Sequence, residues 1–185
     1  MTVAAPNVRV AITGEVYFAP LGSTAPTNST TALNVAFKGL GYLSEDGITE
    51  KWDDSVDTIV AWQSATTVRS ATTKSTLSLG FTMIESNGYV LQNFHRGSTM
   101  TESPAGNFVL NVKPITADPK MWVLHVIDGT KLIRILVGNG EITERGEVVY
   151  KNGQPIGYPV TLMGYPDASG NLMTKFSNDT AWTAS

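Results

Sequence analysis

The alternation of apolar and polar residues along the chain predicts a protein built mainly from β-strands. The clearest strand covers residues 74–85, where large apolar side chains fall on one face and small polar residues fall on the other. Comparable patterns bounded by turn residues predict further strands at residues 8–18, 34–44, 47–55, 107–113, 121–127, 131–137, 141–150 and 154–164. Residues 61–73 are also typical of a strand, but they are polar on both faces.

One helix is predicted directly after the strand at residues 74–85. Ser86 is a suitable N-cap, and Val90 and Phe94 follow at the spacing of one helical face. His95 would sit favourably at the negative end of the helix dipole, and Gly97 would end the helix.

Turn-forming residues divide the remaining chain. Residues 21–33 and 98–106 are rich in Pro, Gly, Ser and Thr, and we predict surface loops there. Turn signals at residues 128–129, 138–140 and 152–153 predict three hairpins.

The length of 185 residues fits a single domain, which we place at residues 1–165, followed by a weakly patterned C-terminal arm at residues 166–185. Charged residues make up only 16% of the chain, and its formal net charge is −3. This sign argues against binding nucleic acid through its phosphates. The chain has no cysteine, which excludes disulfides and thiolate chemistry. No apolar run is long enough to span a membrane and the N-terminus does not resemble a signal peptide, so we expect a soluble, non-exported protein.

Catalytic motifs are absent from the sequence. It contains no serine-hydrolase elbow, no zinc-binding histidine pair and no dinucleotide-binding glycine loop. His125 lies inside an apolar strand, where a structural role is the commoner one, and His95 is interpreted as a cap of the predicted helix. We therefore expect no enzyme activity, no cofactor and no metal.

An acidic run is the most unusual feature of the sequence, because it holds six of the sixteen acidic residues. Its members are Glu45, Asp46, Glu50, Asp53, Asp54 and Asp57. Their spacing does not match a calcium-binding EF-hand loop, and nothing else in the chain supports a pair of glycosidase carboxylates. The commonest explanation of such a run is a solvated face or a hairpin tip.

Four sequence elements carry a family resemblance. They are GYLSEDGITE at residues 41–50, AWQ at 61–63, VR at 68–69, and a strand from residue 77 that closes on IESN at 84–87. In this order and spacing they resemble the major tail proteins, or tail tube proteins, of bacteriophages with long non-contractile tails. The likeness is closest to phages of actinobacterial hosts, and beyond about residue 97 it rests only on the succession of short strands.

The resemblance implies a mainly β fold, a tail-tube β-sandwich with one short flanking helix. Its inner sheet would contribute to a β-barrel shared between subunits. Copies would form hexameric rings that stack into a tube, which encloses the tape-measure protein and conducts DNA during ejection without binding it specifically. Further partners would be the tail terminator and tail-tip proteins. The protein would reside in the tail of the virion, and in the host cytoplasm during assembly.

This interpretation assigns surfaces to the subunit. Residues 53–62 are expected to form an exposed hairpin tip that reaches an adjacent ring. Part of the acidic run, whose six residues are all candidates, is expected to line or rim the channel. The residues expected at contacts between subunits or rings are Lys51, Ile59, Val60, Trp62, Arg69, Leu172, Phe176 and Trp182. Residues 1–7 and 166–185 are expected to be mobile in the free subunit and to become ordered on assembly.

Two other classes of protein remain open. A β-sandwich carbohydrate-binding or virion decoration module would explain the strand count and the four tryptophans, provided that aromatic side chains gather on one exposed face. An enzyme with an unrecognised site is disfavoured, because no nucleophile, metal or phosphate motif is present.

Overall fold

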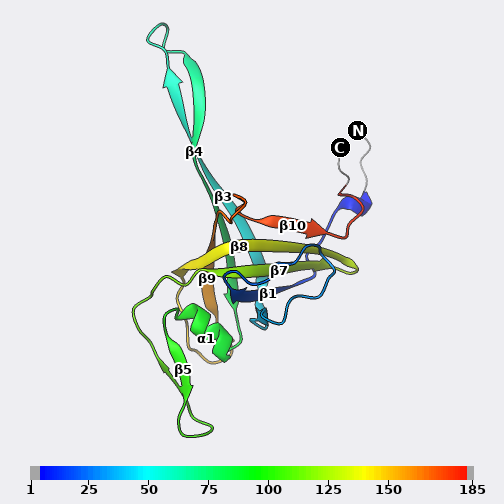
Figure 1. Ribbon diagram of the computed structural model, residues 1–185, viewed down its shortest axis with the longest axis vertical. Helices are drawn as coiled ribbons and strands as arrows, with labels where there is room; N and C mark the ends of the chain where they lie inside the picture. Colours follow the sequence, from blue (N-terminus) through cyan, green and yellow to red (C-terminus); the bar gives the residue numbers. More distant parts are fainter. Residues whose placement is uncertain (1–4, 183–185) are drawn as a thin grey trace.

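The fold is mainly β, as predicted, and residues 5–182 are described by the computed structural model (Figure 1). Its elements are η1 (Ala5–Asn7), β1 (Thr13–Pro20), β2 (Lys38–Gly39), β3 (Leu43–Val60), β4 (Thr67–Met83), α1 (Gly88–Phe94), β5 (Thr99–Glu102), β6 (Phe108–Asn111), β7 (Lys120–Asp128), β8 (Lys131–Arg145), β9 (Tyr158–Tyr165) and β10 (Thr174–Ser177). All strands except β5 and β6 belong to one antiparallel sheet, in the order β2-β1-β7-β8-β9-β4-β3, and β10 also pairs with β8.

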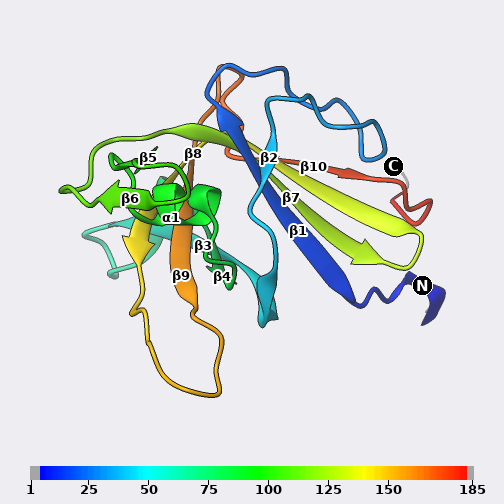
Figure 2. The ribbon, with the colours of Figure 1, turned by 90° about the horizontal axis from the view of Figure 1, so that it is seen from below.

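Strand β8 connects the two halves of this sheet. Its N-terminal half pairs with β7 and β10, and its C-terminal half pairs with β9. The two halves lie in different orientations, because β1 and β7 run diagonally in Figure 2 whereas β9 runs vertically. The chain thereby forms a sandwich in which one long strand belongs to both layers.

The main core lies between the two layers. It contains residues from β1, β4, β7, β8 and β9 and from one face of α1. The buried members are Val16, Leu40, Leu77, Leu79, Phe81, Met83, Val90, Phe94, Trp122, Leu124, Ile135, Val137, Ile142, Tyr158, Val160 and Leu162. The apolar face predicted for the strand at residues 74–85 is therefore confirmed. Removing this apolar surface from water is the main contribution to the stability of the sandwich.

Glycine allows β8 to pass from one layer to the other. A Cβ atom on Gly140 would lie 2.9 Å from Val137 Cγ1 and 3.1 Å from Trp122 Cδ1, so a larger residue would force these side chains to shift. The hairpin predicted at residues 138–140 is therefore wrong. Residues 138–140 lie within the continuous strand β8, at a point where the strand packs closely against the core.

Residues 21–37 cover the outer face of the layer that contains β1 and β7. The predicted loop at residues 21–33 contains no helix or strand, as expected. Phe37 and Leu33 pack on a second cluster that includes Met121 and Val123 of β7. This segment contributes apolar contacts to a second core, although its own sequence is mostly polar.

Several predicted element bounds are corrected by the structure. The first strand begins at Thr13 rather than at residue 8, and Val8, Val10 and Ile12 are exposed. The predicted loop at residues 98–106 contains strand β5, which forms a separate two-stranded sheet with β6.

The helix is shorter than predicted. It begins at Gly88 instead of directly after Ser86, because the side chain of Asn87 caps it by accepting a hydrogen bond from the Val90 N–H. Its last residue is Phe94, and His95 is the C-cap, consistent with the predicted capping position.

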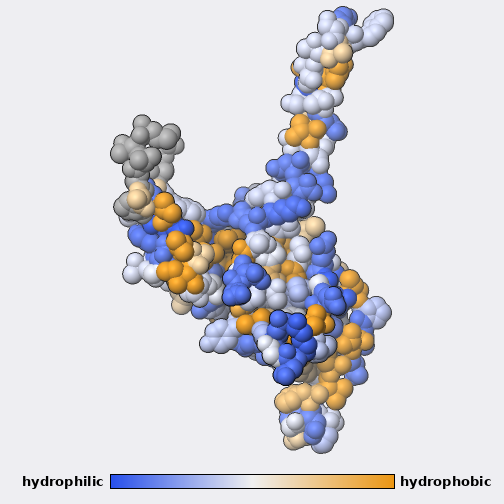
Figure 3. All heavy atoms as spheres, turned by 180° about the vertical axis from the view of Figure 1, so that it is seen from behind, coloured by the Kyte–Doolittle hydropathy of each residue, from blue (hydrophilic) through white to orange (hydrophobic). Residues whose placement is uncertain are grey.

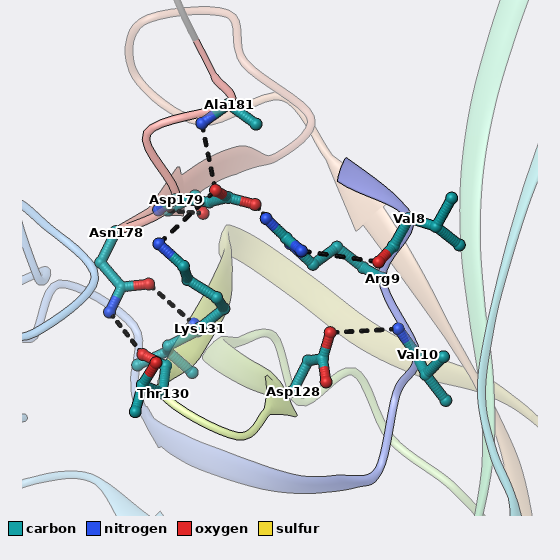
Figure 4. A network of polar contacts seen from close by, with 11 residues as sticks. Val8, Arg9, Val10, Asp128, Thr130, Lys131, Asn178, Asp179 and Ala181 are labelled. Atoms are coloured by element: carbon teal, nitrogen blue, oxygen red, sulfur yellow. Dashed lines mark hydrogen bonds and ion pairs between the residues drawn. The ribbon is translucent and has the colours of Figure 1, made fainter. Parts of the chain in front are cut away.

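The two ends of the described chain meet beside the turn between β7 and β8 (Figure 4). Arg9 forms an ion pair with Asp179, and Lys131 Nζ lies 3.7 Å from the same carboxylate. Hydrogen bonds from Arg9 and from the Ala181 N–H lower the pKa of Asp179 to about 2. The Val10 N–H donates to Asp128 Oδ2 at 3.3 Å.

The C-terminal arm is bound to its own subunit. β10 pairs with β8, with Phe176 opposite Arg134, and Phe176 packs against the second cluster. Leu172 packs against the main core. The expectation that the whole arm lacks a binding surface within the monomer is therefore wrong for these residues. Residues 1–4 and 183–185, also part of the expected mobile ends, lie outside the described residues.

Candidate functional site

A long β-hairpin projects from the sandwich (Figures 1 and 3). It consists of β3 and β4, and β9 pairs with β4 only from Leu77 to Met83. Beyond Leu77 the hairpin has no neighbouring strand, and residues 49–60 and 66–75 are all exposed. This projection therefore leaves two long strand segments exposed on both faces.

The tip of the hairpin lies at residues 61–66. The predicted tip, residues 53–62, is therefore mostly strand, because β3 continues to Val60. The Ala61 N–H donates to the Thr66 carbonyl at 2.8 Å and closes the turn. Within it, Ser64 and Ala65 have φ values of 65° and 47°, in the left-handed region. Trp62 stands at the start of this turn with 97% of its surface exposed.

The two faces of the hairpin differ in composition. Successive side chains of a strand point to opposite faces, and directly paired residues share a face. Trp52 pairs with Leu77, so Trp52 lies on the face that continues the core, which we call the core-side face. Val56 and Val60 follow at even spacing on the same face. The core-side face therefore carries these apolar side chains, which we call the apolar stripe, into solvent, with Asp54 and Thr58 between them.

The opposite face of the hairpin, which we call the outer face, carries most of its charges. From β3 it receives Lys51, Asp53 and Asp57, together with Ile59. From β4, Lys74 pairs with Ser55 and Arg69 pairs with Ile59. Three cationic and two acidic side chains thus share this face.

The register separates the six residues of the acidic run. Asp53 and Asp57 lie on the outer face, and Glu50 and Asp54 lie on the core-side face. The remaining two, Glu45 and Asp46, lie at the base of the hairpin, where the pairing of β3 with β4 is interrupted between Leu43 and Ile48. The run is continuous in sequence but does not form one acidic surface.

Glu50 is held by neighbouring side chains. Its Oε2 lies 2.6 Å from Lys175 Nζ of the C-terminal arm, and its Oε1 accepts a hydrogen bond from Trp52 Nε1 at 2.9 Å. Burial raises the pKa of Glu50, but the bonds from Lys175 and Trp52 outweigh it and lower the pKa below its ordinary value. This carboxylate contributes to the attachment of the arm.

The other residues expected at contacts divide into two groups. Ile59, Val60 and Trp62 are exposed near the hairpin tip. Leu172 and Phe176 are partly buried within the subunit, as described above. Trp182 is half exposed near the C-terminal end of the described chain and remains available to a partner.

The four tryptophans do not gather on one surface. Trp122 is buried in the main core, with its Nε1 donating to the Gly140 carbonyl at 3.0 Å. Trp52 and Trp62 belong to the hairpin, and Trp182 lies in the C-terminal arm. The shared aromatic face that a carbohydrate-binding module requires is therefore not formed by these residues.

A polar cluster beneath the loop of residues 21–37 includes the one histidine that lies in the sheet. Arg134 Nε donates to His125 Nε2 at 2.9 Å, and His125 Nδ1 lies 3.3 Å from Glu15 Oε2. The Arg134 guanidinium also donates to the carbonyls of Asn28 and Thr31, each at 2.8 Å. The structural role predicted for His125 is consistent with these bonds. The part played by Arg134 could not be read from its position in a strand, because it depends on a loop about one hundred residues earlier.

Burial lowers the pKa of His125, and the hydrogen bond to Glu15 only partly opposes this effect. A neutral imidazole is required, because Nε2 must accept the bond from Arg134. Within residues 5–182, no group of three or more His, Asp or Glu residues could hold a metal ion. No helix in the same part of the chain is long and apolar enough to cross a membrane.

Comparison with known proteins identifies the family. No curated protein matches the chain. A solved structure, the crystal structure of Hcp protein, is similar with 14% sequence identity and a TM-score of 0.34, over 90% of this chain and 98% of that chain. A family model described as phage tail tube protein matches residues 1–185. The chain therefore belongs to the phage tail tube protein family and is a structural component of the virion tail.

Proposed function

We propose that this protein is the tube subunit of a phage that has a long non-contractile tail and infects an actinobacterial host. Six copies form a ring, and rings stack into a tube that encloses the tape-measure protein and later conducts DNA. Tail terminator and tail-tip proteins bind the two ends of the tube. Assembly takes place in the host cytoplasm.

The observation that carries this proposal is the uncovered hairpin of β3 and β4. An isolated two-stranded hairpin is marginally stable in water, and its open edges invite pairing with another chain. This one extends well beyond β9, with Trp62 fully presented at its tip. Neighbouring copies of the subunit would cover its edges and its apolar stripe.

Ring closure and stacking follow from symmetry. A head-to-tail contact joins unlike surfaces, so it closes a ring when the rotation fits and otherwise propagates without end. If each subunit lends about four strands, six subunits exceed the roughly 16 to 18 strands that already enclose an aqueous channel. A shared barrel would also remove the open edge of β3.

Electrostatics suggest how the channel passes DNA. We propose that part of the acidic run lines or rims the channel and repels the DNA phosphates, while Lys51 and Arg69 face partner subunits. Asp53 and Asp57 share the outer face with these two cations, so the register would place them at the same contact. Glu45 and Asp46, at the base of the hairpin, are then the preferred channel residues.

The proposal is tested by assembling the purified protein and imaging it. Tubes or hexameric rings are expected by size-exclusion chromatography and electron microscopy. A persistent monomer that binds sugars would instead support the decoration module.

The channel assignment needs a separate test. Phage carrying Glu45→Lys and Asp46→Lys should assemble normal tails but eject DNA more slowly, because cations at the wall would attract the DNA phosphates. This attraction acts only within a Debye length of about 8 Å from the wall. Unchanged ejection kinetics would contradict the assignment of these two residues. Glu144→Lys, on β8, is the control outside the acidic run for each of the two charge reversals made singly.

A further inference from the structure

A second hairpin projects from the opposite end of the molecule (Figure 1). It consists of β5 and β6, which pair only with each other, from Thr99 opposite Asn111 to Glu102 opposite Phe108. Figure 3 shows apolar residues at this lower end as well as along the long hairpin. The exposed apolar side chains here and in the segment that follows are Phe108, Val109, Val112 and Ile115.

This small hairpin has a defined shape. The Ser103 N–H donates to the Asn107 carbonyl at 2.9 Å, and the Gly106 N–H donates to Glu102 Oε1 at 2.7 Å. At its base, the Lys113 N–H donates to the hydroxyl of the buried Ser98 at 3.0 Å. Its apolar residues are thus presented on a fixed turn and base, yet Phe108 remains 66% exposed.

The two projecting hairpins have matching chemistry. The segment around the long-hairpin tip, residues 58–68, contains no charged residue, and neither do residues 103–112. Each segment is bracketed by one acid and one base, Asp57 with Arg69 and Glu102 with Lys113. A centre without charge that contains an aromatic residue and has charges at its rim is typical of a protein–protein interface.

We propose that the β5–β6 hairpin, with residues 112–115, is the surface that receives the long-hairpin tip of a second copy in the next ring. This inference rests on the proposed function. An open-ended stack of identical rings needs two unlike, complementary surfaces at opposite ends of each subunit, and these two hairpins occupy such positions. Trp62 of one copy then packs on Phe108 and Val109 of the other. The charges at the rims of the two hairpins form opposite-sign pairs, Asp57 with Lys113 and Arg69 with Glu102.

The absence of cysteine from the chain allows a direct test by crosslinking. Gln63→Cys places a thiol beside Trp62, and Asn107→Cys places one beside Phe108, without altering either aromatic residue. Tubes assembled from a mixture of the two single variants should yield a disulfide-linked dimer on mild oxidation, because Cα atoms about 4 to 7 Å apart can be bridged. The unassembled mixture should not. Mixtures of Gln63→Cys with Val35→Cys or Tyr150→Cys, at exposed sites on other loops, are the controls.

A chain carrying both cysteines distinguishes stacking from ring closure. A link along the tube produces a covalent ladder that continues past the number of subunits in a ring, whereas a link around the ring stops at that number. Tubes in which the tip fails to link to position 107, or links instead to a control site, would overturn the inference while leaving the tube function intact. Failure of the unaltered protein to form tubes would count against the proposed function itself.

Hydrogen exchange provides a test that needs no variant. In the free subunit the outer edges of β5 and β6 are open, and their amides should exchange rapidly. Assembly of the unaltered protein into tubes should protect amides in Phe108–Asn111 and in residues 61–66 together. Protection of the tip without protection of β6 would also overturn the inference.

Discussion

Replacing Trp62 with alanine separates folding from assembly. The side chain is 97% exposed in the subunit, so its removal should change the free energy of unfolding by no more than about 0.5 kcal/mol. In a contact between rings, an indole can bury roughly 200 Å². At about 25 cal/mol per Å², this burial contributes at most about 5 kcal/mol before the costs of association.

The effect on assembly should be large even after those costs. Truncation of a buried aromatic at the centre of an interface commonly costs about 2 kcal/mol or more, which corresponds to roughly a 30-fold change in one binding constant. Adding a ring would form several such contacts at once. The Trp62→Ala subunit should therefore remain folded but should not elongate at concentrations where the unaltered protein forms long tubes.

The measurement is the critical concentration for tube formation, obtained by pelleting, with tube length from electron microscopy and thermal unfolding of the free subunit. Tyr150→Ala is the matched control, because Tyr150 is also a strongly exposed aromatic residue but lies on a different loop. An unchanged critical concentration and normal tube length for Trp62→Ala would refute the reasoning.

Three further predictions concern the subunit itself. Gly140→Ala should destabilise it by about 1 to 3 kcal/mol in denaturant unfolding, because the new methyl group has no room, whereas Gly39→Ala, whose Cβ would make an ordinary contact at 3.4 Å, should cost less. The free energy of unfolding should fall as the pH drops below about 6.5, because burial lowers the pKa of His125 and of His95 and the unfolded chain then binds more protons. His125→Gln keeps an acceptor for Arg134 and should flatten this pH profile; an unchanged profile would exclude His125 as its source. Amides of Thr174–Ser177 should resist hydrogen exchange in the free subunit, since β10 pairs with β8 of the same chain, and rapid exchange there would restore the idea of an arm that orders only on assembly.

Local sequence patterns determined much of this protein. The alternation from Leu77 to Met83 correctly predicted a strand with one buried face, because the two-residue period of a strand is fixed by backbone geometry alone. The change of period after Glu85 predicted the helix to within two residues of its start, since capping residues act on the nearest turn. The ordered motifs between residues 41 and 87 indicated the family that the whole chain matches.

Tertiary structure decided which segments meet. Glycines at positions 138 and 140 are compatible with a turn or with a strand that changes layer, and only the packing of Val137, Trp122 and Leu162 around Gly140 selects the second. The acidic run reads as one feature, but its division between two faces depends on the register of β3 with β4.

Long-range pairing also decided where the polar and apolar side chains of weakly patterned segments lie. Phe176 and Lys175 find partners on β8 and β3 of the same subunit, which no local pattern indicates. Arg134 is buried, and the loop of residues 28–31 supplies two carbonyl acceptors for its guanidinium. Periodicity specifies the face of a residue within its own strand, whereas its neighbours across space depend on contacts between distant parts of the chain.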